Sequence, residues 1–307
     1  MTGMKYHSPV LLRESVDGLA IRQDGLYVDV TFGGGGHSRE ILKRLGPDGR
    51  LVAFDQDDDA LSNVPEDDRF QLISANFRYI KQYLKFYGIL KVDGILGDFG
   101  VSSHQFDRPE RGFSTRLEAD LDMRMNQNGD ITAKEVVNTY SQEQLKAVLF
   151  RYGELKRAGA IASALVKARE LKPITTTGQL NAVLLPYLQR GREFKGLAQV
   201  YQALRIEVNQ EIEALKELLL QTVDLVRPEG RLSLISYHSL EDRLVKRFIR
   251  TGKFEGEVEK DFYGNPLSPF KGVGKLIVPS AEEISANPRA RSAKLRVAER
   301  MENNKDK

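Results

Sequence analysis

Apolar and polar positions follow two periods in the first third of the chain. Short apolar runs rich in β-branched residues predict buried strands at 26–32, 50–57, 69–77 and 92–101. Helical spacing follows the first and third of these runs, and the helices predicted there cover 38–46 and 78–88. Strands that alternate with short helices predict an α/β fold, in which helices cover both faces of a parallel sheet.

The alternation stops near residue 105. The next buried-strand pattern, 230–239, begins about 130 residues after the fourth run, far more than one helical crossover requires. Most of the gap has helical spacing, at 141–153 (with a capping box at Ser141 and Gln144), 154–171, 178–189 (capped by Thr177) and about 197–226. We therefore predict an all-helical domain at 105–198, inserted into a sheet domain formed by 1–104 and 199–307.

The remainder of the chain adds three elements and a tail. The spacing predicts a helix over 238–250, and the Gly-, Pro- and Phe-rich stretch 253–280 predicts a long loop or a hairpin. Alternation over 293–300 predicts a last strand. The polar tail 301–307 is expected to be disordered.

The composition is typical of a soluble globular protein. Hydrophobic residues make up 41% and charged residues 29% of the 307 residues. We find neither an apolar run near the ~20 residues of a membrane helix nor the apolar segment of a signal peptide. We therefore expect a cytoplasmic protein without a membrane partner. A net charge of +3 does not by itself establish a nucleic-acid partner.

The absence of cysteine excludes several kinds of chemistry. Without Cys there is no disulfide, no thiolate metal ligand and no Cys nucleophile. The histidines lack the spacing of metal ligands, so we expect no metal site; they are His7, His37, His104 and His238.

A glycine-rich turn after the first predicted strand carries the first candidate chemistry. Residues 29–38 read DVTFGGGGHS, and the helix that follows would offer free backbone N–H groups to a ligand. Ser38 stands where a dinucleotide fingerprint has its third glycine. Asp55, at the end of the second strand, is placed to accept both hydroxyls of a ribose. Asp29, beside the loop, fits a sulfonium cofactor better than a pyrophosphate.

Two more strand ends add candidate residues. Phe77 follows the third run and is placed either to pack on an adenine ring or to serve as a core aromatic. Asp98 ends the fourth run. Ligands of open α/β sheets lie at the carboxyl ends of the strands, so both residues join Asp55 in one predicted nucleoside site.

Seven motifs, spread in order over nearly the whole chain, resemble one family. They are TFGGGGHS, GILGDFGVSS, ERGFS, LDMRM, YQALRIEVN, GRLSLISYHSLEDRLVK and NPRARSAKLR. The chain resembles the bacterial small-subunit (16S) ribosomal RNA cytosine-N4-methyltransferases of the RsmH or MraW type. The resemblance implies a class I, Rossmann-like methyltransferase sheet with a helical insertion after the fourth strand. It also implies a cytidine of 16S rRNA near the decoding site as substrate.

The same resemblance implies S-adenosylmethionine as cofactor. The cofactor-binding residues that it implies are Gly35, Gly36, His37, Asp55, Phe77, Asp98 and Gln105. Among them, the two glycines and His37 would hold the methionine end, Asp55 the ribose and Phe77 the adenine.

Methylation of an exocyclic amine needs neither a metal nor a covalent enzyme intermediate. The enzyme must align the amine with the sulfonium methyl and accept its N–H bonds. Methylation at cytosine C5 uses a Cys nucleophile instead, which this chain lacks. Asp98 is the candidate catalytic acceptor for the amine, and a role confined to the cofactor is the equal alternative.

Three basic segments are candidates for RNA contact, because arginine and aromatic side chains stack unpaired bases and clustered cations contact phosphates. They are the loop 107–124, the helix 240–250 and the segment 289–296. The residues singled out for substrate binding are Arg111, Phe113, Arg116 and His238. Solvated faces and surface ion pairs are the alternative explanation.

Other functions stay open on the sequence alone. The chain could methylate a small molecule or another RNA, act as an NAD-dependent oxidoreductase, or serve as a non-catalytic RNA-binding or assembly factor. Ser38 argues against the oxidoreductase, and the glycine loop with Asp55 and Asp98 argues against a non-catalytic factor. The expected partner is small-subunit rRNA or the small ribosomal subunit, and a homodimer is left open.

Overall fold

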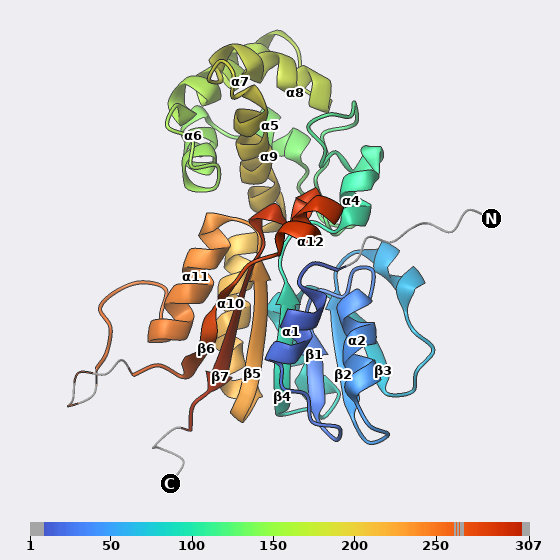
Figure 1. The fold of residues 1–307 in the computed structure, drawn as a ribbon. Coiled ribbons are helices and arrows are strands. Elements are labelled where there is room, and N and C mark those ends of the chain that lie inside the picture. The colour runs from blue at the N-terminus through green and yellow to red at the C-terminus, as the bar shows by residue number, and fades with distance from the viewer. Residues whose placement is uncertain (1–8, 261, 263, 265–266, 303–307) are drawn as a thin grey trace. The chain divides into compact units, whose positions relative to one another are not determined.

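The computed structural model describes residues 9–260, 262, 264 and 267–302, and the chain divides into two compact units. The first, called the sheet unit here, contains the chain up to Gly100 and from Ile212 onward. The second, called the insert, runs from Val101 to Glu211. Figure 1 shows strands and helices in the sheet unit and helices in the insert.

The described residues of the sheet unit form a seven-stranded sheet in the order β3-β2-β1-β4-β5-β7-β6. The pairs from β3 to β5 are parallel, and β7 runs antiparallel to both of its neighbours. The strands are β1 (Leu26–Asp29), β2 (Arg50–Asp55), β3 (Phe70–Ser74), β4 (Val92–Asp98), β5 (Val226–Ser236), β6 (Phe270–Ile277) and β7 (Lys294–Arg300). The predicted strands are confirmed. The stretch 253–280 contains β6, which pairs with β7 outside that stretch.

Helices cover both faces of this sheet because successive strand residues point to opposite sides. Tyr27, Leu51 and Leu96 pack with residues of α1 and α2. Their chain neighbours, such as Val28 and Val52, pack with residues of α3, α10 and α11 on the other face. The elements of this unit are α1 (Leu12–Gly18), α2 (Gly36–Arg44), α3 (Ile80–Phe86), α10 (Glu211–Leu225), α11 (Ser239–Thr251), α12 (Ala281–Ala286), and the 3₁₀ turns Asp58–Asn63, Phe77–Tyr79 and Pro288–Ser292. The predicted α/β class is confirmed.

The insert is helical and has an apolar core of its own. Its elements are α4 (Ser103–Asp107), α5 (Ala133–Thr139), α6 (Gln142–Arg151), α7 (Ala158–Leu171), α8 (Thr177–Leu184), α9 (Glu193–Asn209), and the 3₁₀ turns Pro109–Arg111 and Leu185–Tyr187. The predicted capping box of Ser141 with Gln144 is confirmed. The cap of α8 is Thr176 rather than Thr177, because the Thr176 side chain accepts the Gln179 N–H.

The prediction of one helix over 197–226 is wrong. α9 ends at Asn209, Gln210 has a left-handed backbone with φ of 50°, and α10 begins at the next residue. The Asn209 amide accounts for the stop, since it accepts the Met125 N–H at 2.7 Å and donates to the Met123 and Arg205 carbonyl oxygens. The apolar spacing continues through the break, so the sequence pattern did not reveal it.

The insert begins at Val101 and ends at Glu211, whereas 105–198 was predicted; α9 accounts for the later end. Leu197, Val200, Tyr201 and Leu204 of α9 are buried in the core of the insert. The helix therefore belongs to the insert, whose compact unit extends to Glu211.

Two further observations concern the ends of the chain and the lengths of its helices. Residues 303–307 of the predicted disordered tail lie outside the described residues. Within the described part of the chain, none of the helices combines the length and apolar character needed to cross a membrane.

We expect Asn209→Ala to destabilise the insert by about 1–3 kcal/mol, because three hydrogen bonds to a partly buried side chain are lost. Native-state hydrogen exchange of the α9 amides measures this directly. Lys195→Ala, on the exposed face of the same helix, is the matched control. Equal protection in the two variants would contradict the role given to Asn209.

Candidate functional site

Three aspartates mark the carboxyl ends of three adjacent parallel strands. Asp29 ends β1, Asp55 ends β2 and Asp98 ends β4, with β1 lying between the other two. This edge is where open α/β sheets bind ligands. The structure therefore brings together the strand-end residues that the sequence predicted.

The glycine-rich turn between β1 and α2 is shaped by backbone conformation and close packing. Gly35 has a φ of +72°, and a Cβ there would lie 2.9 Å from the Phe32 ring. A Cβ on Gly36 would lie 2.0 Å from Pro9 Cγ. Neither position accepts a larger residue without rearrangement, because protein side chains already fill the space that a Cβ would occupy. Gly33, with a φ of +49°, would have nothing within 4 Å of a Cβ, so the turn is open at that residue.

Asp29 accepts hydrogen bonds from residues on both sides of the glycine-rich turn. Its carboxylate accepts the Ser38 hydroxyl at 2.7 Å and the Thr31 N–H at 3.1 Å, and it is fully buried. Burial raises the pKa of Asp29, while the hydrogen bonds from Ser38 and Thr31 oppose that rise. Ser38, at the third glycine position of a dinucleotide fingerprint, thus has a structural partner inside the protein.

Asp55 is tied to the same turn from β2. One carboxylate oxygen accepts the Gly33 N–H at 2.6 Å and the other accepts the Asp57 N–H at 2.9 Å. Burial raises the pKa of Asp55 to about 6, and these two bonds limit the rise. Each oxygen keeps a further lone pair, so the carboxylate can hold the loop and also accept ligand hydroxyls.

Asp98 differs from the other two because its carboxylate is incompletely paired. Its backbone N–H donates to Thr31 Oγ1 at 2.7 Å, and its side chain is hydrogen-bonded with Tyr237. Oδ1 is buried and has no hydrogen-bond partner among the described residues. Burial raises the pKa of Asp98 to about 6, and the nearby His37 opposes the rise. A buried acceptor without a donor is costly, so this oxygen is placed to receive one from a ligand.

His37, the second residue of α2, lies against Asp98. Its Nε2 is 3.2 Å from the Val10 carbonyl oxygen, and its Nδ1 is 3.9 Å from Asp98 Oδ2. Burial lowers the pKa of His37, which favours the neutral ring. Only a protonated Nε2 can donate to the Val10 carbonyl, so Nδ1 of the neutral ring is an acceptor. Two acceptors therefore face one another at the end of β4.

Phe77 opens the 3₁₀ turn after β3 and is partly buried. Its ring centroid lies 5.8 Å from that of Phe99, the residue after Asp98. The sequence prediction missed Phe99, whose position in the GDFG motif was the available signal. It also missed Tyr237, which follows the end of β5 and is hydrogen-bonded with Asp98.

Gln105 belongs to the insert, where it completes the capping box of α4. Its side chain accepts the Ser102 N–H at 3.1 Å, and its own N–H donates to Ser102 Oγ at 3.2 Å. This local role accounts for a glutamine at the third position of the helix. A contact of Gln105 with the cofactor stays a prediction.

Two of the residues predicted to bind substrate, Arg111 and Phe113, are buried inside the insert, and a substrate contact of either stays a prediction. Arg111 is 5% exposed and donates from Nη2 to the Arg124 and Met125 carbonyl oxygens. Phe113 is 4% exposed and packs edge-on against Phe106. Both side chains therefore have partners within the insert.

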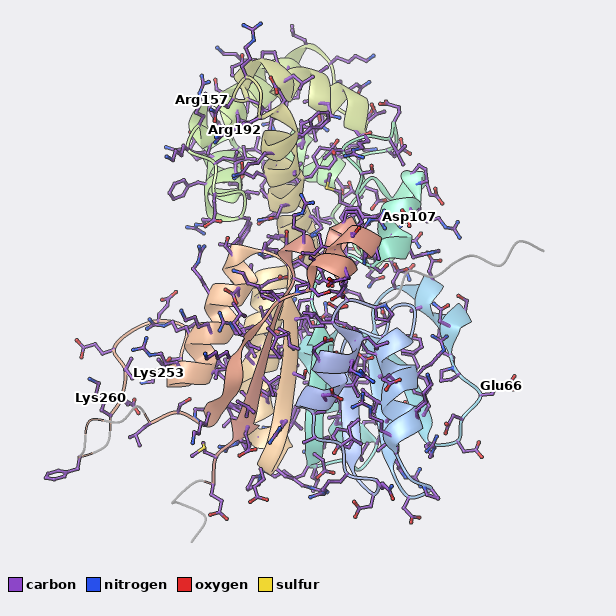
Figure 2. The ribbon with its side chains drawn as sticks, in the orientation of Figure 1. Glu66, Asp107, Arg157, Arg192, Lys253 and Lys260 are labelled. Carbon is purple, nitrogen blue, oxygen red and sulfur yellow. The ribbon has the colours of Figure 1, made fainter. Side chains whose placement is uncertain are left out.

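Arg116 is exposed and remains a candidate for RNA contact. Other arginines of the predicted basic segments are paired: Arg108 with Glu110, Arg124 with Asp122, and Arg296 with Asp242. The insert carries further exposed arginines that the sequence prediction passed over, and Figure 2 labels Arg157 and Arg192 among them.

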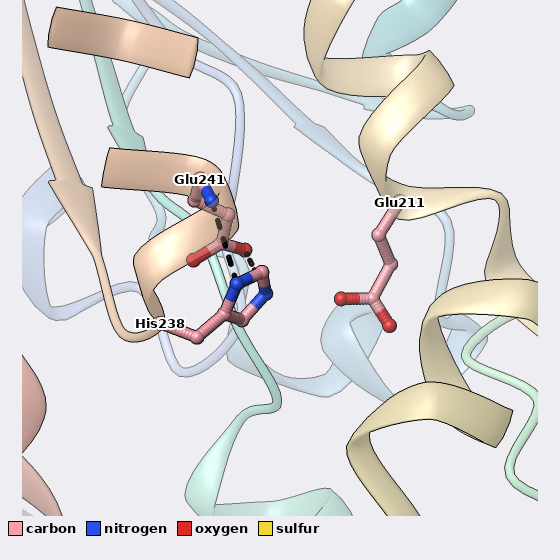
Figure 3. A group of neighbouring side chains, drawn as sticks. All are labelled: Glu211, His238 and Glu241. Atoms are coloured by element: carbon pink, nitrogen blue, oxygen red, sulfur yellow. Dashed lines mark hydrogen bonds and ion pairs between the residues drawn. The ribbon is translucent and has the colours of Figure 1, made fainter. Parts of the chain in front are cut away.

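His238 caps the N-terminus of α11. Its Nδ1 accepts the Glu241 N–H at 3.4 Å, and its Nε2 lies 3.2 Å from Glu241 Oε1, as Figure 3 shows. Glu241 in turn accepts the Tyr237 N–H at 3.0 Å. The hydrogen bond at Nδ1 gives the spacing of His238 and Glu241 a local structural explanation, while Nε2 is buried and has no hydrogen-bond partner within the described residues. A substrate contact of His238 stays a prediction.

The sequence has clear relatives among known proteins. The MraW methylase family matches residues 4–301. The ribosomal RNA small subunit methyltransferase H of Christiangramia forsetii is 66% identical, over 97% of this chain and 99% of that protein. The protein of the same name from Flavobacterium johnsoniae is 62% identical, over 98% and 99%. An rRNA methylase structure from Streptococcus thermophilus aligns with 98% of this chain and 100% of its own at 12% identity and a TM-score of 0.43, too low to support an argument.

We expect Asp98→Asn to stabilise the ligand-free protein at pH 8 by about 1–3 kcal/mol. The pKa of Asp98 is about 6 in the fold, above its usual value, so the native state binds the extra proton. Stability is therefore lost as pH rises towards 6, and the neutral Asn avoids this loss.

The gain should be complete above pH 6 and absent below about pH 4, where the acid is protonated in both states. Calorimetric unfolding at pH 8, 6 and 4 measures it. The exposed Asp68, changed to Asn, is the control. A gain that persists unchanged at pH 4 would show that charge burial is not its cause.

Proposed function

The chain belongs to the MraW methylase family, and we propose that it transfers a methyl group from S-adenosylmethionine to the N4 amine of a cytidine in small-subunit (16S) rRNA, near the decoding site. The observation that carries this proposal is the buried, unpartnered Asp98 Oδ1 beside the glycine turn. Relatives named ribosomal RNA small subunit methyltransferase H, at 55–66% identity, support the choice of rRNA.

The residues at the strand ends fit S-adenosylmethionine. The turn is open at Gly33, and Asp55 keeps lone pairs for the ribose hydroxyls. Phe77 offers a partly buried ring for the adenine. His37 Nδ1 and Asp98 Oδ1 are acceptors suited to the methionine ammonium. When bound, this cofactor supplies an electrophilic methyl group on a sulfonium.

Methyl transfer then requires a hydrogen-bond acceptor for the cytosine amine and a fixed orientation of its nitrogen. Asp98 Oδ1 would accept an N–H of the cytosine amine and keep the nitrogen aligned for in-line attack. A role for the same oxygen towards the cofactor ammonium is the alternative. The lack of cysteine closes the C5 route on cytosine, which leaves amine or oxygen methylation for a pyrimidine substrate.

The proposed rRNA substrate also leads to proposals for the partner, the location and the role of the insert. We propose the small ribosomal subunit as partner and the cytoplasm as location, because that is where an rRNA substrate is assembled. We further propose that the insert contributes to substrate recognition, with the exposed Arg116 as its first candidate residue.

Labelled S-adenosylmethionine with unmethylated small subunits should yield N4-methylcytidine at one position of the rRNA. Nuclease digestion and mass spectrometry identify the nucleoside and map its position. Naked rRNA and a small-molecule mixture are the comparison substrates. Label that enters a metabolite, or a ring carbon of the base, would overturn the proposed function.

Asp55→Ala should weaken S-adenosylmethionine binding by about 10–100-fold, because charge-assisted bonds to the ribose and the tie to Gly33 are both lost. Isothermal calorimetry measures the affinity, with the exposed Asp68→Ala as control. Affinity equal to that of the control would remove Asp55 from the cofactor site.

A further inference from the structure

A groove of about 660 Å³ lies at the outer edge of the sheet unit, away from the cofactor residues along the sheet order. α11 forms one side and β6 the other, with Arg296 and Val297 of β7 between them. Figure 1 shows α11 beside β6 and β7 at this end of the sheet. All of these elements belong to one compact unit, so the groove is a feature of the sheet unit alone.

Five of the fourteen residues that line this groove are cations. Four of them are exposed and have no ion-pair partner within the described residues: Lys246, Arg250, Lys271 and Lys275. A fifth, Arg296, is held by Asp242 at 2.7 Å. No carboxylate lines the groove among the described residues. Glu299, opposite Lys271 in register, pairs with Arg231 instead.

Two ordinary explanations account for part of this charge. Lysines on an exposed edge strand prevent pairing with another sheet, and this explains the positions of Lys271 and Lys275. A cation in the last turn of a helix opposes the helix dipole, which covers Arg250. Neither explains Lys246, which stands four residues before Arg250, where like charges on a helix repel. Within the described residues, no ion pair offsets the repulsion between Lys246 and Arg250.

The floor of the groove is open and partly apolar. A Cβ on Gly272 would have only Ile249 Cγ2 within reach, at 3.9 Å, and one on Gly274 would meet nothing within 4 Å. Ile249, Val273 and the exposed Leu276 supply apolar surface. A cavity that combines cations with apolar surface in its lining suits a strand of phosphates, riboses and bases.

The strand register shows where the groove leads. Asp98 pairs with Ile235 on β5, Ile235 with Leu295 on β7, and Leu295 with Ile277 at the end of β6. The end of the groove at Leu276 therefore lies next to the row of the sheet that contains Asp98. Three steps between strands separate them, a distance of about 14 Å.

We propose that this groove binds the phosphate backbone of the rRNA strand beside the nucleotide to be methylated, an inference that rests on the proposed function. Lys246, Lys271 and Lys275 contact phosphates, and the apolar floor contacts riboses or bases. The groove guides the strand along the sheet edge towards the carboxyl ends of β4 and β5.

The triple variant Lys246→Ala, Lys271→Ala, Lys275→Ala tests the charges. Its affinity for a small-subunit rRNA fragment should fall on the order of 100-fold at 0.1 M salt, and the slope of log K against log salt should flatten by about 2. S-adenosylmethionine affinity should not change. The control removes three exposed lysines elsewhere in the unit, Lys43, Lys85 and Lys91, with the same change in net charge.

A second variant tests whether the open floor of the groove is needed for RNA binding, and it leaves the charge of the protein unchanged. Gly272→Leu fills the floor where the structure leaves room, so it should fold and bind the cofactor normally while binding RNA more weakly. RNA affinity and salt slope equal to those of the lysine control would overturn the inference, even if wild-type protein methylates rRNA. Loss of a dimer in the groove variants with unchanged RNA binding would also overturn it, in favour of a protein partner. Wild-type protein that neither binds nor methylates rRNA would refute the proposed function itself.

Discussion

The site depends on three carboxylates, one fully buried and two partly buried, at the ends of adjacent parallel strands. Removing a carboxylate from water is unfavourable unless hydrogen bonds replace the lost hydration. Asp29 and Asp55 receive those bonds from Ser38, Thr31 and the backbone of the glycine turn. Asp98 keeps a buried oxygen without a donor. The difference separates two carboxylates that build the turn from one that is left available to a ligand.

The hydrogen bonds accepted by Asp29 and Asp55 also fix the conformation of the glycine turn. Gly33 is drawn towards β2 by Asp55, and the first turn of α2 is fixed to β1 through Ser38 and Asp29. The turn is therefore held from two strands at once by hydrogen bonds within the protein. A preformed turn loses less conformational freedom when it binds a ligand.

The sequence correctly predicted the features that depend on hydrophobic periodicity and on the order of the strands. The α/β class, the strands and the placement of Asp55 and Asp98 at one sheet edge follow from local patterns and from the geometry of parallel sheets, and the family is confirmed by its match to residues 4–301. The roles of single side chains did not follow. Arg111 and Phe113 occur in a loop rich in charge, yet tertiary hydrogen bonds and packing bury both of them. A sequence pattern does not distinguish an arginine that binds a carbonyl from one that binds a phosphate.

The length of the insertion has a physical consequence for the fold. A crossover between neighbouring parallel strands needs only a dozen or so residues. The chain between β4 and α10 instead forms helices whose apolar residues, from Phe113 to Leu204, pack with one another. A segment with its own core meets most of its stability requirement internally. Substitutions in that core therefore act mainly on the insert, while β4 and β5 stay paired by their own register through Asp98 and Ile235. The geometry of the strand ends is therefore set by the register of the sheet itself.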